Sequence, residues 1–114
     1  MTKDSKKGQA YRHTPAFILL FLAKEDFYGA SLLNTIQRDL ALDSMDSPVI
    51  YRTLRDLEAE GSVESYWETN ITGPARKWYK ITSKGLDKLE NLKEDIEMRR
   101  KVFDNFIEIY NKLK

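Results

Sequence analysis

The sequence predicts a mostly α-helical protein with a small β-hairpin, an α+β fold in which a winged helix-turn-helix carries a long C-terminal helix. Three observations predict it. Two amphipathic helical patterns, 29–42 and 47–60, are separated only by the short turn 43–46. Two segments rich in β-branched and aromatic residues follow, at 63–67 and 77–81. From residue 82 onward, apolar residues recur at intervals of three and four.

The whole-chain composition predicts an ordinary globular protein. With 114 residues, 41% of them hydrophobic and 32% charged, the chain has the size and balance of one compact domain with an extension. We expect a domain over 1–82 that includes a flexible, polar N-terminal arm over 1–11, and a separate C-terminal helix over 83–114. The absence of cysteine rules out disulfides and fits a reducing cytoplasm.

Chemistry-bearing residues are scarce. His13 is the only histidine, no His/Cys cluster has metal-ligand spacing, and the five glycines are too dispersed for a phosphate loop. We therefore expect no enzyme, no metal and no cofactor. The apolar run 16–23 is too short to span a bilayer and is followed by charged residues, so no membrane partner is expected either.

The first helix is predicted over 15–24, with Thr14 as its cap and Pro15 at its first position. Apolar residues occupy nearly every side of this segment, which indicates the central buried helix of the domain. The second helix, 29–42, has an inner face marked by Leu33, Ile36 and Leu40, with Leu32 adding a flank.

The third helix has the clearest boundaries. Ser47 is expected to be its N-cap, Pro48 its first helical residue and Gly61 the left-handed residue that ends it. Arg52 and Arg55 project away from the apolar stripe. That stripe consists of Ile50, Leu54 and Leu57.

The hairpin follows, with strands at 63–67 and 77–81 and a protruding loop at 69–75. Trp67, Trp78 and Tyr79 alternate along these strands. We expect one face of them to belong to the core, since paired strands must cover the helices; a stacking platform for single-stranded nucleic acid is the alternative.

The last helix is predicted from Thr82, as its cap, to about residue 112, a length of about 45 Å. Apolar residues spaced by three and four form a stripe along this helix, and Arg99 alone interrupts it. So long a helix cannot bury this stripe on its own small domain, so a second copy of the chain is the expected partner; the alternative is a helix folded back over its own domain. The expected dimer interface comprises Leu89, Leu92, Ile96, Phe103, Phe106 and Tyr110.

Positive charge is local, because the net charge is only +1. Basic residues gather near the N-terminus (Lys3, Lys6, Lys7 and Arg12), on the third helix, and after the hairpin tip (Arg76, Lys77 and Lys80). On one surface they would make a positive patch, and a helix with a basic outer face beside a basic hairpin is shaped to enter a DNA groove. Charge alone does not exclude three separate solvated patches.

Three segments stand out in combination: 27–30 (Phe-Tyr-Gly-Ala), the Tyr, Leu, Leu and Gly pattern of 50–61, and 73–85. Together they resemble the PadR family of bacterial transcriptional regulators, in its short form with one C-terminal helix. The resemblance implies a homodimer that binds a partly palindromic double-stranded operator, represses, and is released by a small-molecule effector. It matches Tyr51 to the family's recognition-helix tyrosine and Arg76 and Lys77 to its basic wing. Pro48 and Val49 depart from the family's usual glycine and hydroxyl residue. The C-terminal helix also lacks the tryptophan with which some drug-sensing members bind flat ligands.

The candidate DNA-binding residues are Ser47, Tyr51, Arg52, Arg55, Arg76 and Lys77. Arginine can bind guanine O6 and N7 in a bidentate manner, whereas basic wing residues contact phosphates or the minor groove. Pairing of the arginines with Asp46, Asp56 or Glu58, and a half-buried Tyr51, are the alternatives.

A different function stays open, a winged-helix protein-interaction module that does not bind DNA specifically. Acidic residues close to the third helix and the first strand would repel phosphates if they faced the same way. They are Glu58, Glu60, Glu64 and Glu68.

Overall fold

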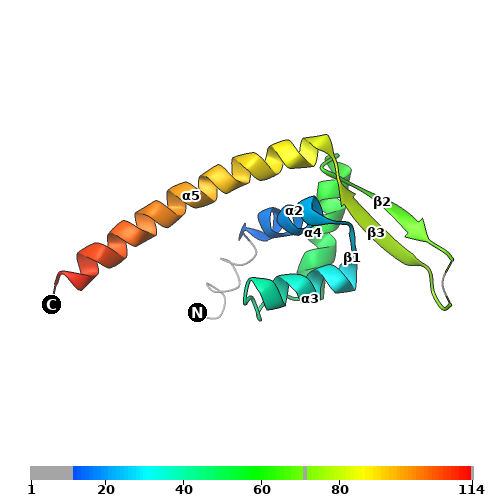
Figure 1. The fold of residues 1–114 in the computed structure, drawn as a ribbon, viewed down its shortest axis with the longest axis horizontal. Coiled ribbons are helices and arrows are strands. Elements are labelled where there is room, and N and C mark those ends of the chain that lie inside the picture. The colour runs from blue at the N-terminus through cyan, green and yellow to red at the C-terminus, as the bar shows by residue number, and fades with distance from the viewer. Residues whose placement is uncertain (1–11, 71, 114) are drawn as a thin grey trace.

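The computed structural model describes residues 12–70 and 72–113 and shows an α+β winged helix from which one long helix extends (Figure 1). The predicted fold class is confirmed. The elements in chain order are α2 (Thr14–Lys24), β1 (Phe27–Tyr28), α3 (Gly29–Asp39), α4 (Ser47–Ala59), β2 (Val63–Glu68), β3 (Arg76–Ile81) and α5 (Ser83–Asn111).

Helix α2 forms the centre of the domain, as its all-round apolar pattern predicts. Ile18 and Leu19 are fully buried and Leu22 is 2% exposed, with α3, α4 and α5 packed around the helix. Helices α3 and α4 add their apolar faces to the same core. Their fully or almost fully buried members are Leu32, Ile36, Ile50, Leu54 and Leu57.

The predicted caps of α2 and α4 are wrong by one residue. Asp46, not Ser47, is the N-cap of α4, because its Oδ1 accepts a hydrogen bond from the Val49 amide at 3.3 Å. In α2 the N-cap position belongs to His13, and Thr14 lies inside the helix. The Thr14 side chain is buried, where its hydroxyl donates to Met45 Sδ at 3.8 Å and so packs the core.

Helix α3 ends at Asp39, three residues before the predicted end. Leu40 is its C-cap. Ala41 adopts a left-handed conformation with φ of 53°, which a right-handed helix cannot accommodate. The end of α4 follows the prediction more closely: Glu60 is the C-cap, and Gly61 follows in the left-handed region with φ of 86°.

The hairpin is confirmed, but the sheet has a third strand that the sequence did not reveal. The strand order is β1-β3-β2 and both pairs are antiparallel. In β1, Phe27 pairs with Tyr79 and Tyr28 with Trp78. A strand of two residues is too short to show an alternating pattern, so only the tertiary fold defines it.

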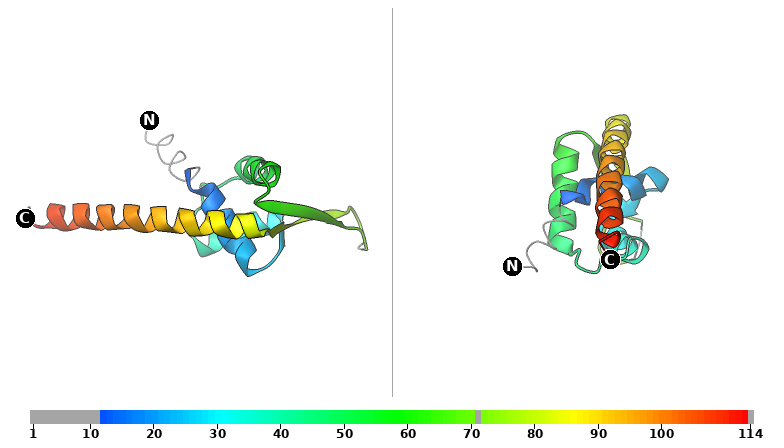
Figure 2. Two further views of the ribbon diagram at one scale, coloured as in Figure 1. Left: turned by 90° about the horizontal axis from the view of Figure 1, so that it is seen from above. Right: turned by 90° about the vertical axis from the view of Figure 1, so that its left-hand side faces the viewer.

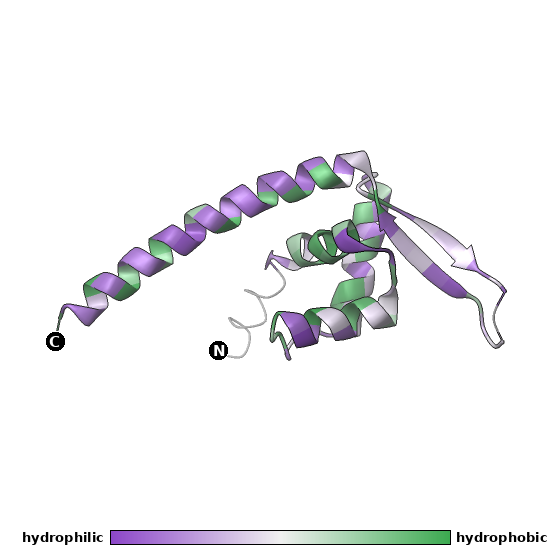
Figure 3. Cartoon of the chain, viewed as in Figure 1, coloured by the Kyte–Doolittle hydropathy of each residue, from purple (hydrophilic) through white to green (hydrophobic). Residues whose placement is uncertain are grey.

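Helix α5 runs from Ser83 to Asn111, close to the predicted bounds, and Thr82 is its N-cap, accepting from the Gly85 amide at 3.1 Å. Its first half crosses α2, and its second half continues beyond the domain (Figures 1 and 2). The structure is accordingly elongated, measuring 62 × 29 × 21 Å. Hydrophobic residues recur along the extended half of α5, where no other described element lies beside them (Figure 3).

The junction between the wing and α5 depends on a close approach at Gly85. A Cβ atom at Gly85 would overlap the backbone carbonyl oxygen of Ser62 and lie 2.7 Å from Ile81 Cγ1. The Thr82 hydroxyl donates to the same region, to Gly61 O at 2.6 Å. The backbone of α5 is therefore held directly against the residue that precedes β2.

We expect Gly85→Ala to lower the free energy of unfolding by about 3 kcal/mol, since the clash is with backbone that cannot rotate away. Alanine would otherwise favour a helix by about 1 kcal/mol over glycine. Urea denaturation measures the effect. Asp87→Ala, on the exposed side of the same turn, is the control and should change stability little. A Gly85→Ala variant as stable as wild type would contradict the close packing of α5 on Ser62.

Candidate nucleic-acid interface

The outward face of α4 carries the residues that the sequence singled out. Ser47, Tyr51, Arg52 and Arg55 are all exposed, with Tyr51 at 44%. At about 100° per residue, Arg52 lies almost opposite the buried stripe of Leu54 and Leu57, about 170° around the helix, and Arg55 lies about 130° from the stripe. The face that α4 turns away from the core is therefore basic and aromatic.

Neither arginine of this face is held by a carboxylate. Within residues 12–70 and 72–113, no ion pair or side-chain hydrogen bond involves Arg52 or Arg55. Asp46 caps the helix, and Glu58 is bound elsewhere. The guanidinium groups of Arg52 and Arg55 therefore keep all their donors available for a partner outside the described chain.

Tyr51 is packed on one side and open on the other. A Cβ atom at Gly29 would overlap the Tyr51 ring, so the ring lies directly against the start of α3. This is the half-buried arrangement considered as the alternative for Tyr51, and it leaves part of the ring accessible. Glycine at position 29 is what allows α3 and α4 to approach so closely at this point.

A groove of about 350 Å³ joins α4 to the wing. Its lining comes from the start of α3, from Tyr51 and from the wing. The fold thus brings three of the predicted DNA-binding residues, Tyr51, Arg76 and Lys77, to one site. The groove is lined by Tyr28, Gly29, Ala30, Tyr51, Trp67, Ala75, Arg76, Lys77 and Tyr79.

The two wing cations lie on opposite faces of the sheet, since neighbouring residues of a strand alternate. The Arg76 guanidinium lies 4.8 Å from the centre of the Tyr28 ring, whereas the Lys77 ammonium lies 5.5 Å from that of Tyr79. Lys77 also pairs with Glu58 Oε1 at 3.8 Å, with both side chains partly exposed. This pair fastens the wing to α4.

Most of the acidic residues near this face have partners. Glu58 accepts from Ser65 Oγ at 2.6 Å, and Glu68 accepts from the Trp78 indole at 2.9 Å. Glu60 accepts from Ser62 Oγ and from the Lys88 ammonium, at 2.6 and 2.7 Å. The hydrogen bond from Lys88, and then that from Ser62, lower the pKa of Glu60. These carboxylates serve to join α4, the wing and α5.

The sequence predicted that one face of the aromatic residues in the wing, Trp67, Trp78 and Tyr79, belongs to the core. This prediction is right for Tyr79 and wrong for Trp67. Tyr79 is 7% exposed and belongs to the core cluster, and Trp78 is partly buried. Trp67 is 62% exposed, because β2 has already left the helices at this point and runs into the protruding tip.

Of the third group of basic residues, Arg12 alone lies within the described residues, and it is not part of this surface. Lys3, Lys6 and Lys7 lie outside the described residues. Arg12 is on the side of α5: a hydrogen bond from Arg99 chiefly lowers the pKa of Asp95, and the nearby charge of Arg12 adds to the effect. Lys80 is exposed on the face of β3 that carries Arg76.

The predicted dimer-interface residues of α5 fall into two groups. Leu89, Leu92 and Ile96 are partly buried, the first two against the domain's own core. Phe103, Phe106 and Tyr110 are exposed at 59%, 67% and 53%. The fold-back alternative therefore describes the first half of the stripe, and the second half has no cover among the described residues.

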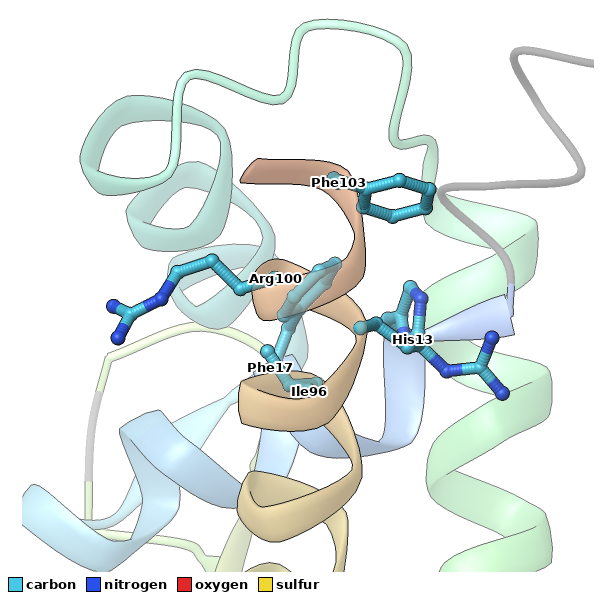
Figure 4. Close-up of a pocket in the computed structure, with 6 residues that line it drawn as sticks. His13, Phe17, Ile96, Arg100 and Phe103 are labelled. Atoms are coloured by element: carbon cyan, nitrogen blue, oxygen red, sulfur yellow. The ribbon is translucent and has the colours of Figure 1, made fainter. Parts of the chain in front are cut away.

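A second hollow, of about 250 Å³, lies between the start of α2 and the middle of α5 (Figure 4). Phe17, Ile96 and Phe103 give it an apolar surface, and three basic side chains stand around it. These are His13, Arg99 and Arg100. Arg99 is bound to Asp95, with Nε and Oδ2 2.8 Å apart.

A winged helix with a basic outer helix face and a basic wing defines a protein of the kind that regulates transcription. A family model described as the transcriptional regulator PadR-like family matches residues 18–91. The chain therefore belongs to the PadR-like family.

Solved structures agree with this assignment. A PadR-like transcriptional regulator from Bacillus cereus is 26% identical with a TM-score of 0.77, over 88% of this chain and 96% of that one. A transcriptional regulator from Clostridium thermocellum, 24% identical, also has a TM-score of 0.77 and covers 94% and 98%. Bacillus subtilis PadR, solved in complex with operator DNA, is 24% identical with a TM-score of 0.62, over 68% of this chain and 44% of that one.

None of the curated proteins with which the chain was compared is significantly similar to it. Across the described residues, no helix combines the length and the apolar character that crossing a membrane requires.

Proposed function

We propose that this PadR-like regulator binds double-stranded DNA in a sequence-specific manner through α4 and the wing. One observation carries the proposal: Arg52 and Arg55 lie exposed and unpaired among the described residues, on the face of α4 opposite the core. Support comes from the resemblance in fold to a PadR protein solved with its operator. DNA binding needs no catalytic group. The cytoplasm, where the DNA lies, is the expected location of the protein.

Each candidate residue has a role in this proposal. Arg52 and Arg55 read guanine edges in the major groove. Ser47 and Tyr51, one turn apart at the start of α4, contact the phosphate backbone. Arg76 and Lys77 hold the wing against the backbone or the minor groove, which positions the protein without specifying a sequence.

The working unit that we propose is a homodimer. Residues 1–82 would bind DNA and residues 83–114 would join the two protomers. The exposed aromatic residues of α5 support this, because large apolar surfaces on a protruding helix are typical of an interface. Two α4 helices related by a two-fold axis would then read a partly palindromic operator.

Repression, and release by a small molecule, stay predictions. The hollow between α2 and α5 is the place we propose for an effector, because it is apolar and adjoins the exposed half of α5 (Figure 4). A ligand bound there would contact the helix that sets the distance between the two DNA-binding domains.

The protein-interaction alternative has weaker support. It rested on four acidic residues that would repel phosphates, and three of them are engaged in hydrogen bonds within the chain. Only Glu64 of the four makes no side-chain hydrogen bond or ion pair among the described residues.

Selection of bound duplexes from a random pool tests the proposal. We expect an inverted repeat whose half-sites lie about one helical turn apart, and an affinity that falls as salt rises. If selection enriches no motif and only weak, salt-sensitive binding is seen, the DNA-reading function is wrong. The search would then turn to protein partners.

A further inference from the structure

Trp67 is an exposed aromatic residue outside the hydrophobic core. Its side chain is 62% exposed at the end of β2, where the hairpin leaves the helical domain. Burial of an indole contributes much to stability, and Trp67 provides little of this contribution. A large aromatic residue held in the open is typical of a contact surface.

The register of the hairpin determines what Trp67 faces. Trp67 pairs with Lys77 across the strands, so both side chains lie on the same face as Tyr79. The Lys77 ammonium is 5.9 Å from the centre of the Trp67 ring. Trp67 thus lines the same groove as Tyr51, with the Lys77 ammonium beside it.

The indole N–H of Trp67 has no acceptor in the described chain. Trp78, the other tryptophan, donates its N–H to Glu68 Oε1 at 2.9 Å on the opposite face of the sheet. No described residue accepts from Trp67. The donor is therefore free. The Lys77 ammonium next to it attracts an anionic acceptor, with part of its charge offset by Glu58 Oε1 at 3.8 Å.

We propose that Trp67 contacts the backbone of duplex DNA, and that its indole N–H donates to a phosphate oxygen that enters the groove between α4 and the wing. The inference rests on the DNA-binding function proposed above and adds a residue that the charge pattern does not reveal. The bond positions the wing and carries no sequence information, since every phosphate offers the same acceptor.

Fluorescence tests the contact directly, because the chain has only two tryptophans. In Trp78→Phe, Trp67 is the sole indole, and its emission should change when a short mixed-sequence duplex is added at low salt. In Trp67→Phe, the remaining Trp78 should respond less. Anisotropy of a dye on the duplex reports complex formation independently in both variants.

Affinity measurements separate the N–H from the ring. Trp67→Phe keeps an aromatic ring and should weaken binding about two- to tenfold, the effect of removing one hydrogen bond. The slope of log K against log salt should stay unchanged, since indole displaces no counterion. Lys77→Gln should instead reduce that slope by about 0.9, the value for one phosphate that is no longer neutralised. Trp78→Phe is the matched control and should bind as the wild type does.

The outcomes distinguish the two proposals. If the labelled duplex binds but Trp67 emission stays constant, or Trp67→Phe binds as tightly as wild type, the Trp67 contact is wrong and DNA binding stands. If no duplex binds at all, both are wrong. Because Trp67 is exposed, its replacement should leave the thermal midpoint unchanged, so weaker binding would not reflect unfolding.

Discussion

Replacing Arg52 and Arg55 together by alanine is expected to abolish sequence-specific DNA binding and leave the fold intact. A good bidentate arginine–guanine pair contributes about 1–3 kcal/mol of discrimination, so each substitution should weaken operator binding about 10- to 100-fold. Neither side chain makes an ion pair or a side-chain hydrogen bond with a described residue, so stability should not fall when they are removed. Titration of the selected operator measures the effect.

Arg38→Ala is the matched control for the arginines. Arg38 is also exposed, but it lies at the end of α3 and pairs with Asp39 at 2.8 Å. Its removal lowers the positive charge of the surface as each single arginine variant does, and it should leave operator affinity nearly unchanged. If the double variant binds its operator like the wild type, α4 does not read the sequence through these residues.

Phe103→Asp together with Phe106→Asp is expected to convert a dimer into a monomer. Burial of each phenylalanine at an interface stabilises it by about 1.5–3 kcal/mol, and an unpaired carboxylate there is strongly unfavourable. Both rings are more than half exposed within the chain, at 59% and 67%, so the monomer should fold normally. Sedimentation equilibrium should therefore show the mass of one chain for the variant and of two for the wild type.

The control for this pair places charge on the other side of α5. Lys101→Gln with Asn105→Asp makes the same change in net charge, on the helix face opposite the stripe, and should leave the dimer intact. A variant with aspartate at both phenylalanine positions that still sediments as a dimer would move the interface away from this half of α5. A wild type that sediments as a single chain would contradict the proposed dimer.

Local sequence was sufficient for most of the fold. Proline positions, a glycine after α4 and the change of apolar period located the helices and the hairpin within a few residues, because these signals act on the backbone nearby. The predicted N-caps of α2 and α4 were wrong because a neighbouring residue took each cap position. The carboxylate of Asp46 accepts from the Val49 amide and so takes the N-cap position expected for Ser47, and Thr14 is buried in the core instead of capping α2.

The candidate site was likewise predicted only in part from the sequence. That Arg52 and Arg55 point outward follows from helix geometry alone, so the sequence determined it, together with the family to which the chain belongs. That Tyr51 packs against Gly29, and that the first half of the α5 stripe is covered by the chain's own core, depends on contacts between distant segments.

By itself, then, the sequence determined the order of the elements, the outward basic face of α4 and the apolar stripe of α5, since each is a matter of local periodicity. Only the tertiary structure decided the pairing of β1 with β3, the groove between Tyr51 and the wing, and the exposure of Trp67. The physical reason is that burial and charge pairing depend on which surfaces meet across the chain, and no local pattern encodes which distant segments come together.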